Sequence, residues 1–172
     1  MLSVLLGCGL RRSEVAGLKI SEIQRREDHW AIVDLVGKAG HVRTVPVPAW
    51  AKSAVDAWAE SVPIVAGKLF WSIRKNGTVW GTGITQNVVW YVVKACANRV
   101  GIKPLVPHDL RRTYARLCHA AGGELEQIQF LLGHASVQNT ERYIGCKLDL
   151  SQVLSDKRYI PLRFADEMFL WR

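Results

Sequence analysis

The sequence lacks the features that would place it among membrane, secreted or zinc-binding proteins. None of its apolar runs approaches the roughly 20 residues needed to cross a bilayer, and its N-terminus lacks the positive region of a signal peptide. The four cysteines are scattered and form no Cys-x-x-Cys pair, which argues against a zinc site and favours reduced, mostly buried thiols. Internal repeats and low-complexity segments are also missing. The sequence therefore predicts a soluble, cytoplasmic protein.

The histidine spacings typical of metal hydrolases are absent too. The sequence contains neither His-x-x-x-His nor His-Glu-x-x-His. The adjacent pair His108 and Asp109 would suit a metal phosphohydrolase, but such a site needs further histidine and aspartate ligands. We expect no metal site.

Acidic residues are few compared with basic ones. The chain of 172 residues has 15 Asp and Glu against 23 Lys and Arg, a net charge of +8. Lysine and arginine on a phosphate backbone release its counterions, so this balance favours a polyanionic partner. The hydrophobic content of 49% matches one ordinary globular domain.

Hydrophobic periodicity predicts an α+β fold, mainly helical with a small antiparallel sheet. The expected helices cover residues 2–6, 13–18, 50–62, 84–100, 108–121, 124–132 and 137–144. The alternating stretches 29–36 and 41–48 flank the glycine-rich "GKAG" and predict a β-hairpin. A second hairpin is expected around Asn76-Gly77, a strong turn signal.

Two of these helices carry more detailed expectations. In helix 13–18, Ser13 is the expected N-cap and Glu14 lies in the first turn, where a negative charge is favourable. The buried side of helix 84–100 is expected to consist of Ile84, Val88, Tyr91, Val92 and Ala95.

Two stretches carry cationic side chains whose placement invites a functional interpretation. Arg11 lies at the turn between two helices, where it could reach across a cleft; a surface charge is the alternative. His108 and Arg111 are three residues apart and share one helix face, while Asp109 and Arg112 are expected to point elsewhere. A solvated basic helix would explain the second stretch equally well.

A third stretch, "LLGHASVQNTERYI", places His134 nine residues ahead of Tyr143. A helix end, a loop and a short helix with a half-buried tyrosine would account for this spacing. A histidine and a tyrosine that meet at one ligand would account for it too.

Together these stretches resemble the tyrosine recombinases, also called phage integrases. The motifs are Gly-Leu-Arg-x-Ser-Glu-x-x-x-Leu at 9–18, Gly-Lys at 37–38, His-x-x-Arg at 108–111, and Leu-Gly-His at 132–134 followed nine residues later by tyrosine. They occur in the family's order, and the likeness covers roughly residues 5–145. The resemblance implies that residues 1–147 form the family's catalytic domain.

The resemblance also implies how DNA would be cut. Tyr143 would attack a DNA phosphodiester and form a 3′-phosphotyrosine. Arg11 and Arg111 would bind the non-bridging oxygens, a task suited to the planar guanidinium fork. A phenol is a poor nucleophile at neutral pH, so neighbouring cations and a base must favour its phenolate.

The remaining roles concern protons and the phosphate. His108 would assist proton transfer at the tyrosine, Lys38 would protonate the leaving 5′-oxygen, and His134 would hydrogen-bond the phosphate. Because fixed arginines supply the positive charge, the resemblance implies neither a metal nor a cofactor.

The resemblance further implies double-stranded DNA as partner, with a tetramer on DNA and a monomer or weak dimer when free, and no membrane. The family's N-terminal clamp domain is missing, so we expect an excised catalytic domain or a truncated product. The segment 148–172 is rich in apolar residues and is expected to pack in cis or on a second subunit.

Two other functions stay open. A type IB topoisomerase has similar arginines, lysine and tyrosine, although the "LLGH" motif favours the recombinases. A truncated, non-catalytic DNA-binding module is the other alternative. The DNA target and the biological setting do not follow from the sequence.

Overall fold

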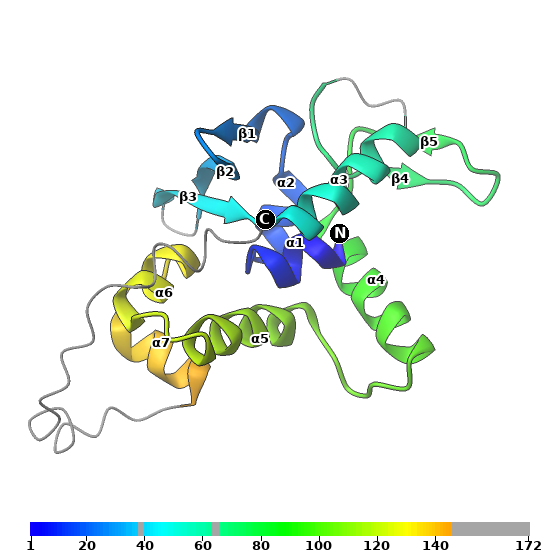
Figure 1. Cartoon of the computed structure of the whole chain (residues 1–172). Helices are drawn as coiled ribbons and strands as arrows, with labels where there is room; N and C mark the ends of the chain where they lie inside the picture. The colour runs from blue at the N-terminus through cyan, green and yellow to red at the C-terminus, as the bar shows by residue number, and fades with distance from the viewer. Residues whose placement is uncertain (38–39, 63–65, 146–172) are drawn as a thin grey trace, which may run out of the picture.

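The computed structural model describes residues 1–37, 40–62 and 66–145 (Figure 1). Lys38 and the segment 148–172 lie outside these residues. All seven predicted helices are present and confirm a mainly helical α+β fold, and none in the described residues is long and apolar enough to cross a membrane. The helices are α1 (Leu2–Gly7), α2 (Arg12–Gly17), α3 (Ala49–Ser61), α4 (Gln86–Arg99), α5 (Pro107–Ala120), α6 (Leu125–Leu132) and α7 (Val137–Ile144).

The main sheet is antiparallel, with the strand order β1 (Ile23–Arg26), β2 (His29–Val36) and β3 (Val42–Val47). Strands β2 and β3 confirm the predicted hairpin, and a register shift interrupts their pairing between Ile32 and Leu35. Strand β1 was not predicted, because its sequence Ile-Gln-Arg-Arg lacks the apolar alternation of a strand. A 3₁₀ turn, η1 (Ile20–Glu22), leads into it.

The second predicted hairpin is also confirmed. Strands β4 (Ser72–Ile73) and β5 (Val79–Trp80) pair antiparallel on either side of the Asn76-Gly77 turn. Gly77 has a φ of 83°, a left-handed conformation that glycine adopts readily.

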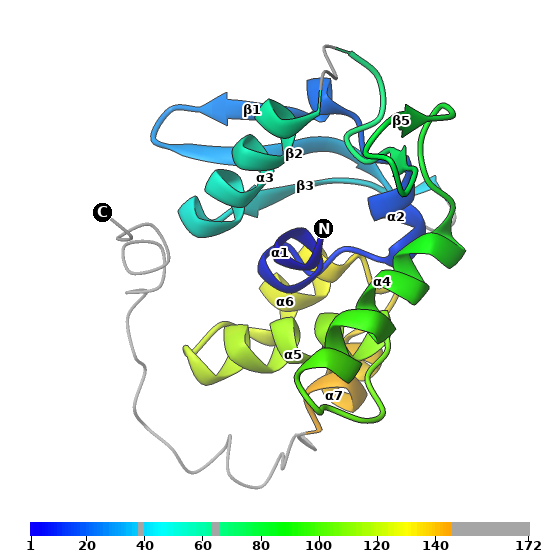
Figure 2. The ribbon, with the colours of Figure 1, turned by 90° about the vertical axis from the view of Figure 1, so that its right-hand side faces the viewer.

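The larger of two hydrophobic clusters lies between the main sheet and helices α1–α4. Figure 2 shows α1 between the layer formed by the sheet with α3 and the helices α5 and α6. The fully buried members of this cluster include Val4, Leu5, Leu10, Val45 and Val89. Burying α1 on several sides fixes the turn that follows it, which carries Arg11.

The smaller cluster joins α5, α6 and α7, and Tyr143 packs at its border. It meets the larger cluster where the α1–α2 turn crosses α5. A Cβ atom on Gly9 would lie 2.4 Å from Cδ1 of Tyr114, and Gly9 has a φ of 59°. Only glycine permits this close crossing, which brings Arg11 and α5 together.

The predicted N-cap of α2 is wrong. The helix begins at Arg12, with Arg11 as N-cap, so Ser13 lies inside the first turn. The carboxylate of Glu14 accepts a hydrogen bond from the backbone nitrogen of Arg11 at 2.7 Å. Glu14 thus satisfies the backbone donor of the N-cap residue.

The predicted buried face of α4 is only partly confirmed. Ile84 is buried and Val88 packs against the larger cluster, as predicted, but Ala95 is exposed. Val89, Val93 and Ala97 are buried, whereas Tyr91 is 65% exposed. The run Val88-Val89-Trp90-Tyr91-Val92-Val93 is apolar at every position, so its periodicity cannot select a face.

Candidate functional site

Five of the six predicted site residues lie together where the two hydrophobic clusters meet. Arg11 caps α2, and His108 and Arg111 lie in the first turns of α5. His134 follows the end of α6, and Tyr143 lies on α7. The sixth, Lys38, lies outside the described residues. Its neighbour Gly37 donates a hydrogen bond to the His41 carbonyl at 2.7 Å, at the end of the β2–β3 hairpin.

The hydroxyl of Tyr143 lies against the imidazole of His108. It is 3.0 Å from Nδ1 and also contacts Nε2, and the two rings meet edge to face with centroids 4.9 Å apart. Burial and, next, the Arg112 guanidinium lower the pKa of His108 below its ordinary value. The imidazole is therefore neutral at pH 7 and able to accept the phenol proton.

His134 also packs against the tyrosine ring. The centroids of His134 and Tyr143 are 4.6 Å apart at an interplanar angle of 69°. Nδ1 of His134 lies 3.1 Å from the hydroxyl of Thr140, which is fully buried. Burial, with the charges of Arg111 and Arg11, lowers the pKa of His134 to about 4. His108, His134 and Tyr143 are called the tyrosine edge below.

Arg111 is buried between the two clusters, with only 1% of its surface exposed. Its Nη1 donates to the Gly9 carbonyl at 2.5 Å, and its Nη2 donates to the Leu132 carbonyl. Burial and the neighbouring Arg11 lower the pKa of Arg111 to about 10, so the guanidinium remains charged at neutral pH. These bonds fix its orientation before any ligand binds.

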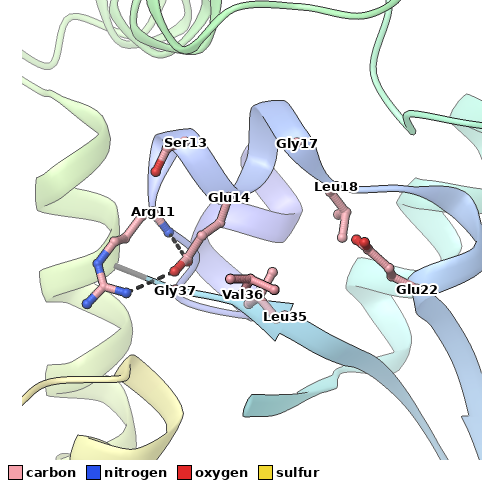
Figure 3. Close-up of a pocket in the computed structure, with 9 residues that line it drawn as sticks. All are labelled: Arg11, Ser13, Glu14, Gly17, Leu18, Glu22, Leu35, Val36 and Gly37. Atoms are coloured by element: carbon pink, nitrogen blue, oxygen red, sulfur yellow. Dashed lines mark hydrogen bonds and ion pairs between the residues drawn. The ribbon is translucent and has the colours of Figure 1, made fainter. Parts of the chain in front are cut away.

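Arg11 is more accessible, with 26% of its side chain exposed. Its Nη1 donates to Glu14 at 2.8 Å, as Figure 3 shows, and its Nη2 donates to the Gly133 carbonyl at 2.8 Å. Arg11 thus joins the start of α2 to the end of α6. Gly133 closes α6 with a φ of 59°, which explains the glycine of the Leu-Gly-His motif.

A third arginine, Arg43 on β3, completes this arrangement, and the sequence analysis did not single it out. Its Nη1 and Nη2 donate to the two carboxylate oxygens of Glu14 at 3.0 and 2.9 Å, and its Nε donates to the Leu131 carbonyl at 2.8 Å. Three successive carbonyls at the end of α6 therefore each accept a hydrogen bond from a different arginine. Arg11, Arg43, Arg111 and Glu14 are called the arginine frame below.

Glu14 is the only acidic residue among these contacts in the described part of the chain. Burial alone would raise its pKa, but hydrogen bonds from Arg43 and Arg11 lower it below the ordinary value. Nη1 of Arg111 lies 3.9 Å from the same carboxylate. One anion among three guanidinium groups leaves the site positively charged.

Two of the missed residues carried a signal in the sequence. Arg43 is in phase with the buried Val45 and Val47 on β3, so strand alternation alone places it on the inner face. Glu14 was assigned only a favourable charge at a helix start, since its partner Arg43 is 29 residues away in the sequence. Nothing local marks Thr140 as a partner of His134.

Arg112 corrects a further expectation, because it does not point away from the site. Its Cζ lies 5.7 Å from the ring centroid of Tyr143. Asp109 does turn away, and its carboxylate accepts a hydrogen bond from the backbone nitrogen of Val106 at 2.9 Å, at the start of α5. The helix therefore presents His108, Arg111 and Arg112 to the site.

The surface beside these groups is hollowed. A cavity of about 440 Å³ is lined by Arg11, His108 and Arg111 together with Arg12, Gln86 and Trp90. A second, of about 450 Å³, is also lined by Arg11, together with Glu14 and Gly37 (Figure 3). The first cavity can take an anion against three guanidinium groups and one imidazole, with the Tyr143 phenol in contact with that imidazole.

Several known proteins that are similar in sequence are tyrosine recombinases. The tyrosine recombinase XerD of Listeria monocytogenes serotype 4b is 30% identical over 148 residues, which cover 83% of this chain and 48% of that protein. The XerD of Mycobacterium tuberculosis is 35% identical over 150 residues, 83% of this chain and 46% of its own length. The chain spans about half the length of the relatives it matches.

Solved structures show the same fold. The XerH site-specific recombinase bound to its difH substrate superposes with a TM-score of 0.71 at 23% identity, over 91% of this chain and 45% of that one. The XerA recombinase gives a TM-score of 0.67 at 25% identity, over 91% and 56%. Residues 1–147 match the phage integrase family throughout. The chain therefore belongs to the phage integrase family.

Proposed function

We propose that residues 1–147 form the catalytic domain of a site-specific DNA recombinase, which cleaves and rejoins strands through a 3′-phosphotyrosine. One observation carries the proposal: the Tyr143 hydroxyl contacts a neutral imidazole beside a cavity lined by Arg11 and Arg111. A nucleophile, its base and the cations for a phosphate are thus within one site.

In the cleavage step, the Tyr143 oxygen attacks the phosphorus and its proton passes to His108. The new O–P bond replaces the bond to the 5′-oxygen of the next nucleotide, which leaves and takes up a proton. Lys38 is the donor that the family resemblance predicts. The reverse attack by a 5′-hydroxyl restores the diester, so the phosphotyrosine conserves the bond energy and no ATP is needed.

Arg11 and Arg111 stabilise the charge that develops on the non-bridging oxygens. Their orientation is set by carbonyls of α6 and by Gly9, so little reorganisation accompanies the reaction. Nδ1 of His134 faces the hydroxyl of Thr140. Its Nε2 is therefore the nitrogen that would hydrogen-bond the phosphate. These residues supply the charge themselves, and the proposal invokes neither metal nor cofactor.

Double-stranded DNA is the proposed partner, with assembly on DNA into a tetramer and a monomer or weak dimer when free. The XerH structure, titled as bound to its difH substrate, and the basic charge of this chain support this choice. The proposed location is the cytoplasm. Contacts would be mainly to phosphates, so binding should weaken steeply as salt is raised.

The test is a suicide DNA substrate carrying a nick beside the scissile phosphate, scored for a covalent protein–DNA band. We expect a band with the unaltered chain and none with Tyr143→Phe, which lacks the bond-forming oxygen. The Phe variant should melt at the same temperature and bind DNA equally well. A band from the Phe variant would refute the assignment. Relaxation of a supercoiled plasmid without recombination sites would point instead to a topoisomerase.

A further inference from the structure

Arg43 is the most deeply placed cation that the proposed reaction leaves unused. Its side chain is only 2% exposed, and it stands on β3, apart from the elements that bear the tyrosine edge. Within residues 1–37, 40–62 and 66–145, the hydrogen bonds of its guanidinium go to Glu14 and to the end of α6.

Without Arg43 as its partner, the carboxylate of Glu14 would compete with a bound phosphate for Arg11 and Arg111. Its carboxylate is buried and lies within reach of both proposed phosphate ligands, at 2.8 Å from Arg11 and 3.9 Å from Arg111. A buried carboxylate without a full partner draws in the nearest cations, because an uncompensated charge is poorly tolerated there. Arg43 binds both oxygens of Glu14 and thereby neutralises it.

The same pairing sets the position of Arg11. Nη1 of Arg11 and Nη1 of Arg43 donate to the same oxygen, Oε1 of Glu14. A Cβ on Gly37 would lie 2.9 Å from Nη1 of Arg43 and 3.4 Å from Nη1 of Arg11, so the two guanidinium groups meet beneath this residue. Moving Glu14 would therefore move Arg11.

We propose that Arg43 is a positioning residue: by saturating Glu14 and binding the Leu131 carbonyl, it keeps the guanidinium of Arg11 oriented and available for the scissile phosphate. The proposal rests on the recombinase function proposed above. It assigns Arg43 no contact with DNA. Its effect on the rate passes through Arg11.

This dependence can be measured with a double-mutant cycle. Single-turnover cleavage of the suicide substrate is measured at saturating DNA for the unaltered chain, Arg43→Met, Arg11→Met and the double variant. Arg43→Met should slow cleavage by about 100-fold, the order expected when a preorganised group is displaced by roughly 1 Å. In the Arg11→Met background the further loss should be under about twofold, since the two changes remove one function.

The controls separate this role from stability and from DNA affinity. Arg26→Met removes an exposed arginine from β1 and should leave the saturated rate unchanged. Arg43→Lys retains the charge but lacks the planar guanidinium fork. Its single-turnover cleavage rate should therefore lie between those of the unaltered chain and Arg43→Met. If Arg43→Met does not fold, as judged by its melting curve, the cycle is run with Arg43→Lys.

Two results would overturn the inference. One is an unchanged single-turnover rate in a folded Arg43 variant. The other is an equal slowing by the Arg43 change with and without Arg11, which would make its role independent of Arg11. Failure of the proposed function looks different, because the unaltered chain would then form no covalent band at all.

Discussion

Arg111 and Tyr143 stand on helices that pack together, yet their surroundings differ. Arg111 is buried and bound to two carbonyl oxygens, whereas Tyr143 is half-buried and its hydroxyl faces an exposed histidine. The arginine frame is bound through α2, β3, α5 and α6, while the tyrosine edge is held mainly by contacts between rings. Charge stabilisation is therefore set in advance, and the nucleophile keeps access to the surface.

The largest effect on the cleavage rate should come from replacing Arg111, the buried arginine of the arginine frame, by lysine. Arg111→Lys keeps a charge but cannot hold both the Gly9 and the Leu132 carbonyls as a planar fork does. Losing one preorganised donor lowers the rate on the order of 100–1,000-fold. Single-turnover cleavage at saturating DNA is the measurement, with the exposed Arg26→Lys as control. Near-normal cleavage by the Arg111 variant would contradict the phosphate role.

A smaller effect is expected from adding a methyl group where the frame meets α6. Gly133→Ala forces a left-handed alanine, which destabilises by about 1–2 kcal/mol. Its Cβ would also lie 3.2 Å from Nη1 of Arg43. Gly101→Ala at the end of α4 has the same kind of φ but open space around it.

Both glycine variants should therefore lose similar stability in chemical denaturation. Only Gly133→Ala should also slow cleavage at saturating DNA, because it displaces Arg43. Equal cleavage rates in the two variants would show that the frame tolerates displacement.

The next effect, smaller again, is a shift in the pH dependence of cleavage, which reports on His108 in the tyrosine edge. Arg112 is the second cause, after burial, of the lowered pKa of His108, and Arg111 and Arg11 act in the same direction while Asp109 opposes them. Arg112→Gln should raise that pKa, so protonation of His108 begins at a higher pH. The acid limb of the cleavage-rate profile should then shift to higher pH. An unmoved limb would argue against His108 as the proton acceptor.

The smallest effect should be on stability at mildly acid pH. His134 has a pKa of about 4 in the folded chain, below the ordinary value of 6.5. The unfolded chain thus binds a proton between these pH values while the folded chain does not, so stability falls as pH drops from about 6.5 towards 4. Denaturation of His134→Gln over this range should show a weaker fall. An identical fall in both proteins would mean that other groups cause it.

Helices and strands with a clear hydrophobic pattern could be predicted from the sequence, whereas those without such a pattern could not. Alternation and the glycine-rich tip predicted the β2–β3 hairpin, and apolar spacing predicted α5, α6 and α7. The uniformly apolar run in α4 left its buried face undetermined, and β1 had no pattern to find. The residues of the tyrosine edge were predicted from the family motifs that contain them, although His108 is 35 residues from Tyr143.

Only part of the arginine frame could be predicted from the sequence, and the reason is physical. Arg11 and Arg111 belong to motifs, whereas Arg43 matters through bonds to Glu14 and Leu131, which are 29 and 88 residues away. Such contacts arise from tertiary packing and leave no local period. The inward phase of Arg43 on β3 was the one available sign.

The most direct test of the account is to locate the covalent bond. The adduct formed on the suicide substrate would be digested with protease and nuclease, and the modified peptide identified by mass spectrometry. We expect the phosphoryl group on Tyr143, with the modification lost in Tyr143→Phe and strongly reduced in Arg111→Lys. A phosphoryl group on another residue, such as Tyr91 or Tyr114, would contradict the assignment of the nucleophile and of the site around it.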